Sequence, residues 1–214
     1  MNILHLDSSI LGSNSITREL SATVVAKLRE QHPSAQVTYR DLVGNEIRHL
    51  TGAIASGFRQ IDAGDFDDAT VREHQISENL VTELLANDVI VIGAPMYNFS
   101  VSSQLKAWLD RIAQAGRTFR YTENGPVGLA GGRKVIVASA RGGFYAEGPL
   151  GHMDYQENYL KAFFRFLGIT DVQFVRAEGA SKPQPVRDKG IALARDSVAG
   201  VLQNLDTSSG QPVQ

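Results

Sequence analysis

The strongest constraint on the fold is an unbroken apolar run, Val89-Ile-Val-Ile92, between Asp88 and Gly93. A strand with one face in water alternates polar and apolar residues, so a continuous run indicates cover on both faces, as in a parallel sheet between helices. A short turn follows, and the next segment spaces apolar residues as one helix face does: Leu105, Trp108, Leu109 and Ile112. The segment therefore predicts a buried parallel strand, a turn and a core-facing helix that includes Trp108, with Ser100 or Ser102 as its N-cap.

Four more predicted strands alternate with helical patterns along the chain. The predicted strands cover 2–6, 36–40, 88–93, 134–139 and 172–175, and the last two helices cover 154–167 and 186–205. Right-handed crossovers between them predict a flavodoxin-like, three-layer α/β fold, a doubly wound sheet of five parallel strands in the order 2-1-3-4-5. Residues 118–127, with the turn Glu123-Asn-Gly-Pro, predict a small β-hairpin insertion. We expect one domain over 1–205 and a loose tail over 206–214.

Composition excludes several classes of function. The formal net charge is -2 over 214 residues and no Lys/Arg stripe marks a helix, so we expect no nucleic-acid partner. No segment approaches the roughly 20 apolar residues of a membrane span, so we expect no membrane partner. The chain has no Cys, which is compatible with a cytoplasmic location and leaves redox chemistry to a cofactor. His5 and His152 lack partners at metal-ligand spacing, so neither a metal nor a catalytic role is expected for them.

The turn after the first strand is rich in hydroxyl groups. It reads Asp7-Ser-Ser-Ile-Leu-Gly-Ser-Asn-Ser-Ile-Thr17 and leads into a helix N-terminus, where free N–H groups favour an anion. The turn has neither the G-x-G-x-x-G nor the GK[ST] signature, so a terminal monophosphate is favoured over a dinucleotide or a P-loop ligand. Taken singly, Ser9, Ser15 and Thr17 are better explained as helix caps or turn formers, and only their cluster favours a phosphate site.

Two further turns lie at the same predicted edge of the sheet. The third strand is followed by Met96-Tyr-Asn-Phe99, in which the Asn98 amide suits the alternating polar edge of a flavin. The fourth is followed by Ser139-Ala-Arg-Gly-Gly143, whose glycines allow a planar ring close to the backbone. Taken singly, the aromatic residues could be packing and the glycines an ordinary loop. Three such turns on one edge predict a flat aromatic ligand that carries a phosphate.

These segments resemble the bacterial FMN-dependent NADH-azoreductases, which are related to the NAD(P)H quinone reductases. The resemblance spans nearly the whole chain and rests on Asp7-Ser-Ser-Ile-Leu-Gly-Ser-Asn-Ser, Gly93-Ala-Pro-Met-Tyr-Asn-Phe, Ser103-Gln-Leu-Lys, Ala115-Gly-Arg-Thr-Phe-Arg-Tyr-Thr-Glu-Asn-Gly-Pro, Ser139-Ala-Arg-Gly-Gly and Gly168-Ile-Thr-Asp-Val. It implies that FMN is the cofactor. By position, it implies phosphate contacts from Ser9, Ser15, Ile16 and Thr17, and isoalloxazine contacts from Met96, Tyr97, Asn98, Phe99, Ser139, Arg141, Gly142 and Gly143. Ala140 replaces a Ser that is usual in the family, so one hydroxyl contact is absent.

The resemblance also implies an activity. NADH or NADPH would reduce FMN, which would then reduce quinones by two electrons and cleave aromatic azo compounds to amines by a ping-pong mechanism. The flavin carries the chemistry, and no catalytic side chain is assigned. The substrate pocket would include Phe99, Tyr121, Phe163 and Phe164, in a homodimer with active sites at the subunit interface. For Phe163 and Phe164, helical spacing equally predicts a core stripe.

Two other classes stay open at this point. A flavodoxin-like electron carrier would bind FMN without NAD(P)H turnover, although such carriers are usually strongly acidic. A regulatory module would bind no flavin. The sequence does not choose between NADH and NADPH, name the acceptor, or say whether a second subunit completes the pocket. It predicts a solvated helix face for Arg18.

Overall fold

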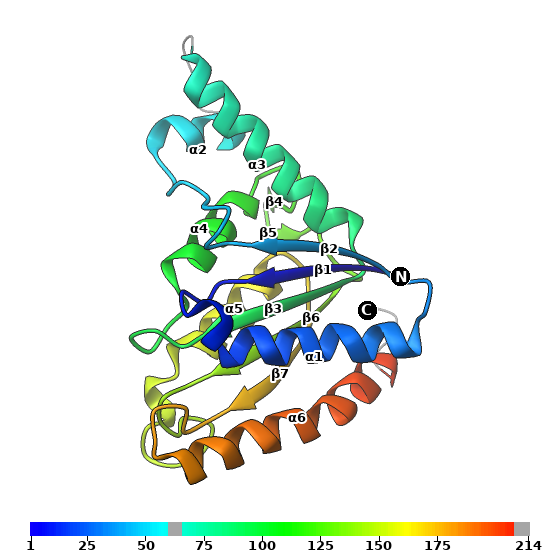
Figure 1. The fold of residues 1–214 in the computed structure, drawn as a ribbon. Helices are drawn as coiled ribbons and strands as arrows, with labels where there is room; N and C mark the ends of the chain where they lie inside the picture. The colour runs from blue at the N-terminus through cyan, green and yellow to red at the C-terminus, as the bar shows by residue number, and fades with distance from the viewer. Residues whose placement is uncertain (60–65, 208–214) are drawn as a thin grey trace.

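The computed structural model describes residues 1–59 and 66–207, and its centre is a parallel sheet of five strands (Figure 1). The strand order is β2-β1-β3-β6-β7. The strands are β1 Asn2–Asp7, β2 Gln36–Asp41, β3 Val89–Pro95, β6 Lys134–Ala140 and β7 Asp171–Ala177. With the hairpin strands β4 and β5 set aside, this is the predicted order 2-1-3-4-5, so the sequence prediction of a flavodoxin-like doubly wound sheet is confirmed.

Helices cover both faces of the sheet. On one face lie α1 Ile16–Gln31 and α6 Gln184–Thr207. On the other lie α3 Asp68–Ala86, α4 Ser103–Ile112 and α5 Tyr155–Phe166, while α2 Gly52–Arg59 packs beside α3. Two short 3-10 turns complete the described elements, η1 Gly12–Asn14 and η2 Gly151–Met153. The result is the predicted three-layer arrangement (Figure 1).

Strand β3 shows why the apolar run has no polar alternation. Ile90 and Ile92 belong to the core under α3, α4 and α5, whereas Val89 and Val91 belong to the core under α1 and α6. Successive side chains of a strand point to opposite faces, and here both faces are covered. Every residue of β3 is buried, and Trp108 is also fully buried in the first core, as predicted.

The predicted hairpin is present as β4 Phe119–Thr122 and β5 Gly125–Gly128, paired antiparallel. It packs on the end of α5, where the Phe119 and Phe166 rings lie 4.5 Å apart. Gly128 is required by this packing, because a Cβ there would lie 2.0 Å from the Gly168 backbone nitrogen. The insertion therefore extends the core at one end of the sheet.

Two predicted boundaries are resolved. Ser102, not Ser100, caps α4, since its Oγ accepts a hydrogen bond of 3.2 Å from the Leu105 N–H. Helix α6 continues to Thr207, so the predicted tail does not begin at 206, and residues 208–214 lie outside the described residues. Among the helices that the structure describes, none combines the length and apolar character needed to cross a bilayer.

Candidate functional site

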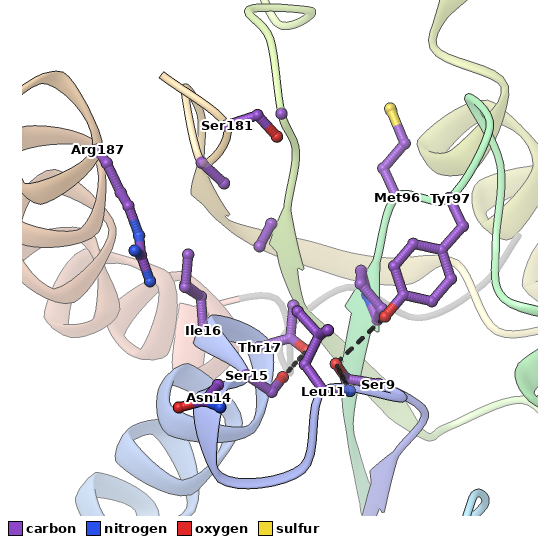
Figure 2. A pocket seen from close by; sticks show the side chains of 14 residues that line it. Ser9, Leu11, Asn14, Ser15, Ile16, Thr17, Met96, Tyr97, Ser181 and Arg187 are labelled. Atoms are coloured by element: carbon purple, nitrogen blue, oxygen red, sulfur yellow. Dashed lines mark hydrogen bonds between the residues drawn. The ribbon is translucent and has the colours of Figure 1, made fainter. Parts of the chain in front are cut away.

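A cavity of about 350 Å³ opens at the carboxyl edge of the sheet, where ligands bind in open α/β folds (Figure 2). Four chain segments line it: the turns after β1, β3, β6 and β7, the last together with the first turn of α6. The lining residues are Ser9, Leu11, Asn14, Ser15, Ile16, Thr17, Pro95, Met96, Tyr97, Ala140, Gly142, Ala180, Ser181 and Arg187. The structure thus brings together all four predicted phosphate contacts with Met96, Tyr97 and Gly142.

The first turn presents hydroxyl groups at the start of α1. Ser15 is the N-cap, and its Oγ accepts from the Arg18 N–H at 3.2 Å and lies 3.1 Å from Thr17 Oγ1. Ser9, Ser15 and Thr17 are all buried at the cavity wall. Hydroxyls beside a helix N-terminus suit an anion, and no acidic side chain is among the residues that line this cavity. Capping of α1 by Ser15 is therefore compatible with the predicted phosphate contact.

Hydrogen bonds fix the first turn to β3. The Ser8 N–H and Oγ both donate to the Gly93 carbonyl, at 3.1 and 2.8 Å. Gly93 leaves room for the Asp7 carboxylate beside β3, because a Cβ at position 93 would be 2.3 Å from Asp7 Oδ1. The first and third turns therefore keep a fixed spacing.

A cluster of charged side chains supports the first turn from the α1 side. The Arg18 Nη2 donates to the Ser9 carbonyl at 3.0 Å and to Asp41 Oδ1 at 2.7 Å. The Tyr39 hydroxyl donates to Asp7 Oδ2 at 3.1 Å, and burial together with the Asp7 charge raises the pKa of Tyr39 to about 12. The hydrogen bond from Arg18 to Asp41 holds the pKa of Asp41 below its ordinary value. The predicted solvated role for Arg18 is wrong, because its guanidinium holds the backbone of the turn.

The turn after β3 is tight and has an unusual backbone. Tyr97 and Ser100 exchange two N–H to carbonyl hydrogen bonds of 3.0 Å. Asn98 and Phe99 between them have φ angles of 48° and 70°, in the left-handed region that bulky residues rarely adopt. Such strain often marks a functional site. The turn leaves Phe99 39% exposed at its tip.

Tyr97 connects this turn to the first one. Its hydroxyl lies 3.4 Å from Ser9 Oγ and accepts from the Ile10 N–H at 3.3 Å (Figure 2). Met96 connects it to β6, because the Met96 N–H donates to the Ala140 carbonyl at 2.9 Å. Asn98 faces another hollow, of about 600 Å³, which it shares with Tyr97, Lys106 and Tyr159.

Two residues predicted to contact the isoalloxazine lie below the fourth turn. Arg141 is fully buried, with Nη1 2.8 Å from Asp154 Oδ2 and Nη2 paired with Glu157. Ser139 Oγ donates to Gln156 Oε1 at 2.7 Å and is also fully buried. Their side chains join β6 to the start of α5 and do not line the cavity, and contact of Ser139 and Arg141 with the isoalloxazine stays a prediction. Ala140 lies at the cavity wall where the family's usual Ser would be.

The glycines of the fourth turn allow the close approach of the turn after β7. A Cβ on Gly142 would lie 2.7 Å from Ser181 Oγ. The backbones are joined by three hydrogen bonds, from Ala180 to Arg141, from Ser181 to Gly142 and from Gly179 to Gly143, at 2.9, 3.3 and 2.9 Å. Gly142 reaches the cavity, whereas Gly143 acts through this pairing.

Sequence reasoning missed the turn after β7, which contributes Ala180 and Ser181 to the cavity, and the first turn of α6, which contributes Arg187. The signal was available, since the carboxyl ends of all parallel strands meet at one edge. The rule that selected the turns after the first, third and fourth strands also selects the segment after the fifth.

The four residues predicted for the substrate pocket are placed very differently. Phe99 is exposed at the β3 turn and Tyr121 is 76% exposed on the hairpin. Phe163 is half-buried and packs between the Tyr159 and Phe164 rings, at 6.1 and 5.6 Å. Phe164 is fully buried in the core, so its side chain cannot reach a substrate, and the core-stripe alternative is the correct one for this residue.

The donors fit a ligand with one anionic end and one flat apolar part. Hydroxyls and the α1 N-terminus occupy one end of the cavity, and Met96, Tyr97 and Pro95 form a wall beside it. Among the described residues, no group of three or more His, Asp or Glu side chains is arranged to hold a metal ion. The fit is therefore to an organic phosphate with an aromatic ring, such as FMN.

Comparison with known proteins agrees with the fold and the site. Residues 1–201 match the family described as having a flavodoxin-like fold, which defines the chain as a flavodoxin-like protein. Over 202 residues it is 60% identical to the FMN-dependent NADH:quinone oxidoreductase of Ralstonia nicotianae, covering 94% of this chain and 97% of that protein. Over 205 residues it is 56% identical to FMN-dependent NADH:quinone oxidoreductase 2 of Xanthomonas axonopodis pv. citri, covering 96% and 95%. The chain belongs to the family of FMN-dependent NADH:quinone oxidoreductases.

A solved structure has the same fold as this chain. The crystal structure of an azoreductase from Bacillus anthracis str. Sterne superimposes with a TM-score of 0.86 at 25% sequence identity, covering 95% of this chain and 99% of that one. The family predicted from the sequence is therefore confirmed, together with the enzyme class. The names of the relatives specify FMN and NADH, as the resemblance implied.

Proposed function

We propose that the protein is an FMN-dependent oxidoreductase that transfers two electrons from NADH to quinones at the cavity described above. The observation that carries the proposal is the convergence of four turns on one anion-binding, aromatic-walled cavity in a chain that is 60% identical to an FMN-dependent NADH:quinone oxidoreductase. Bound FMN supplies the redox chemistry, accepting a hydride and passing two electrons on.

The residues of the chain bind and orient the cofactor. Ser9, Ser15, Ile16 and Thr17 would hold its phosphate through hydroxyls and the α1 N-terminus. Met96, Tyr97, Ala140 and Gly142 would lie along the isoalloxazine. The rigid spacing of the turns matters because productive transfer needs donor and acceptor atoms about 3 to 3.5 Å apart.

The proposal extends to aromatic azo compounds and to a ping-pong mechanism. The likeness to a solved azoreductase supports the first. The second is supported by chemistry, since nicotinamide and acceptor would use the same face of the flavin in turn. Full cleavage of an azo bond to two amines takes four electrons, so two molecules of NADH are needed. Phe99, Tyr121 and Phe163 remain proposed substrate contacts.

A homodimer in the cytoplasm completes the proposal. Phe99 and Tyr121 expose large aromatic surfaces in the single chain, 39% and 76% respectively. A second copy over these residues would bury them and enclose the acceptor. The absence of Cys is compatible with a reducing compartment.

The test is steady-state oxidation of NADH by the flavin-loaded protein, with menadione and with methyl red as acceptors. Parallel double-reciprocal plots are expected for both, with kcat/KM measured for NADH and NADPH side by side. FMN binding without turnover of either acceptor would overturn the enzyme and favour an electron carrier. A protein that binds no FMN on titration would overturn the cofactor site as well.

A further inference from the structure

Arg187 is the only charged side chain among the described residues that line the cavity. It lies in the first turn of α6, on the side of the cavity where α6 packs beside α1. In Figure 2 its side chain extends from α6 toward the end of α1, where Asn14 and Ile16 lie. The sequence analysis did not single out this residue.

Arg187 is exposed, and its charge is not compensated in the absence of an anion. The first turn of a helix carries partial positive charge, so a cation there is destabilising. The first turn of α6 holds no acidic residue that would compensate. Within the part of the chain that the structure describes, the Arg187 guanidinium has no hydrogen bond or ion pair, whereas Arg195 further along α6 pairs with Glu19. A bound anion would pair with the Arg187 guanidinium and would also be attracted by the partial positive charge of the helix N-terminus.

We propose that Arg187 is a cofactor-binding residue that contacts the FMN phosphate from the α6 side of the cavity. The inference rests on the proposed FMN site. Ser9, Ser15 and Thr17 provide neutral donors from the first turn and the start of α1, and Arg187 adds the positive charge that these donors lack. A guanidinium matches phosphate geometry with two parallel N–H donors, which gives directional recognition as well as charge. Arg187 would therefore favour FMN over riboflavin, which has no phosphate.

The test compares the affinities of two flavins for variants of one helix. The dissociation constants of FMN and riboflavin are measured by quenching of flavin fluorescence for the wild-type protein, Arg187→Gln and Arg187→Lys. Lys189→Gln is the matched control, because it removes one positive charge two residues further along α6, and Lys189 lines a separate hollow beside Phe144 and Leu193. Circular dichroism and urea unfolding of each variant check that it folds.

Arg187→Gln should raise the dissociation constant of FMN by between about threefold and about tenfold, the range for a partly exposed charged contact. The constant for riboflavin should not change. Arg187→Lys should keep only part of the FMN affinity, because it retains the charge and loses the paired N–H donors. Lys189→Gln should keep the affinity for both flavins. Added salt should weaken FMN binding less in Arg187→Gln than in the wild type.

Each other outcome overturns a specific statement. Equal FMN affinity in the wild type and Arg187→Gln would overturn the role of Arg187 while leaving the FMN site intact. An equal loss for FMN and riboflavin would show a structural role and overturn the phosphate contact. A wild-type protein that binds neither flavin would overturn the proposed FMN site, which separates failure of the proposed function from failure of this inference.

Discussion

Gly93 shows how one residue sets the geometry of the candidate site. Its carbonyl accepts both Ser8 hydrogen bonds, and a Cβ added to it would lie 2.3 Å from Asp7 Oδ1 and 3.2 Å from the Thr17 carbonyl. Asp7 cannot move away freely, since it is 3% exposed and bonded to Ser21 and Tyr39. The absence of a side chain at Gly93 is therefore what lets the first turn lie against β3.

Gly93→Ala should destabilise the protein by about 1 to 3 kcal/mol through overpacking. Urea unfolding measures the effect, and weaker FMN binding should accompany it because the first turn is displaced. Gly200→Ala is the matched control, since Gly200 lies within α6 with open space around its Cβ direction. That change should be stabilising by about 0.5 to 1 kcal/mol. Equal effects of the two substitutions would contradict the close approach at Gly93.

Arg141 illustrates a buried charge that depends on its partners. Its guanidinium has no exposed surface and pairs with Asp154 and Glu157. Arg141→Met should destabilise the protein by about 3 to 5 kcal/mol, because the buried Asp154 carboxylate loses its cation and Glu157 keeps only Arg176 and Lys161. Lys106→Met, which breaks an exposed pair with Asp110 on α4, should cost no more than about 0.5 kcal/mol. A small loss at Arg141, measured by urea unfolding, would show that solvent or rearrangement replaces the pairing.

Sequence reasoning falls short at this residue scale. Arg141 and Gly142 are adjacent in a recognisable motif, yet one side chain points into the protein and the other residue lines the cavity. The direction depends on Asp154 and Glu157, which lie on a different element, so the motif alone could not reveal it. Arg187 was missed for the opposite reason, because it lies in no motif and only the folded chain brings it to the cavity.

At the scale of elements, periodicity predicted far more. All five sheet strands and the hairpin were located, because β-branched runs and turn residues are local signals. The N-terminus of α5 depends on both local and distant groups: Asp154 Oδ1 accepts from the Gln156 and Glu157 N–H groups at 3.1 and 2.9 Å, and its other oxygen binds Arg141. A cap of this kind joins the helix to the sheet.

The attachment of α5 to β6 and β7 should be sensitive to acid. Burial raises the pKa of Glu157, but the Arg176 hydrogen bonds and the charges of Arg141, Arg176 and Lys161 outweigh it and lower the pKa below its ordinary value of 4.5. A lowered pKa means that the ionised carboxylate stabilises the folded state above pH 4.5, and that this contribution is lost as pH falls through the folded-state pKa.

Glu157→Gln should therefore be less stable than the wild type at neutral pH, and the gap should narrow as the pH is lowered below that ordinary value. Urea unfolding at a series of pH values measures the difference in free energy of unfolding. A gap that stays constant down to the acid transition would show that Glu157 stabilises α5 by packing and not by its charge.

At the scale of the whole molecule, the sheet separates two cores that meet only through its strands. The larger core lies under α3, α4 and α5 and the smaller one under α1 and α6. The cavity lies at the edge where loops from both sides converge, with α1 and α6 contributing one wall and the β3 and β6 turns the other. A ligand bound there would connect segments that are separated by most of the chain length.

Flavin binding should consequently stabilise the entire fold. A ligand that binds only the folded state at 100 times its dissociation constant adds about 2.7 kcal/mol, which for a chain of this size raises Tm by roughly 5 to 10 °C. Thermal unfolding followed by circular dichroism with increasing FMN should show a shift that continues to grow with the logarithm of FMN concentration. Riboflavin should give a smaller shift at equal concentration, because the hydroxyls of the first turn and the α1 N-terminus then have no phosphate to bind. A shift of equal size for both flavins would place the binding energy on the ring alone, and the serine-rich turn would then be a structural cap and not a phosphate site.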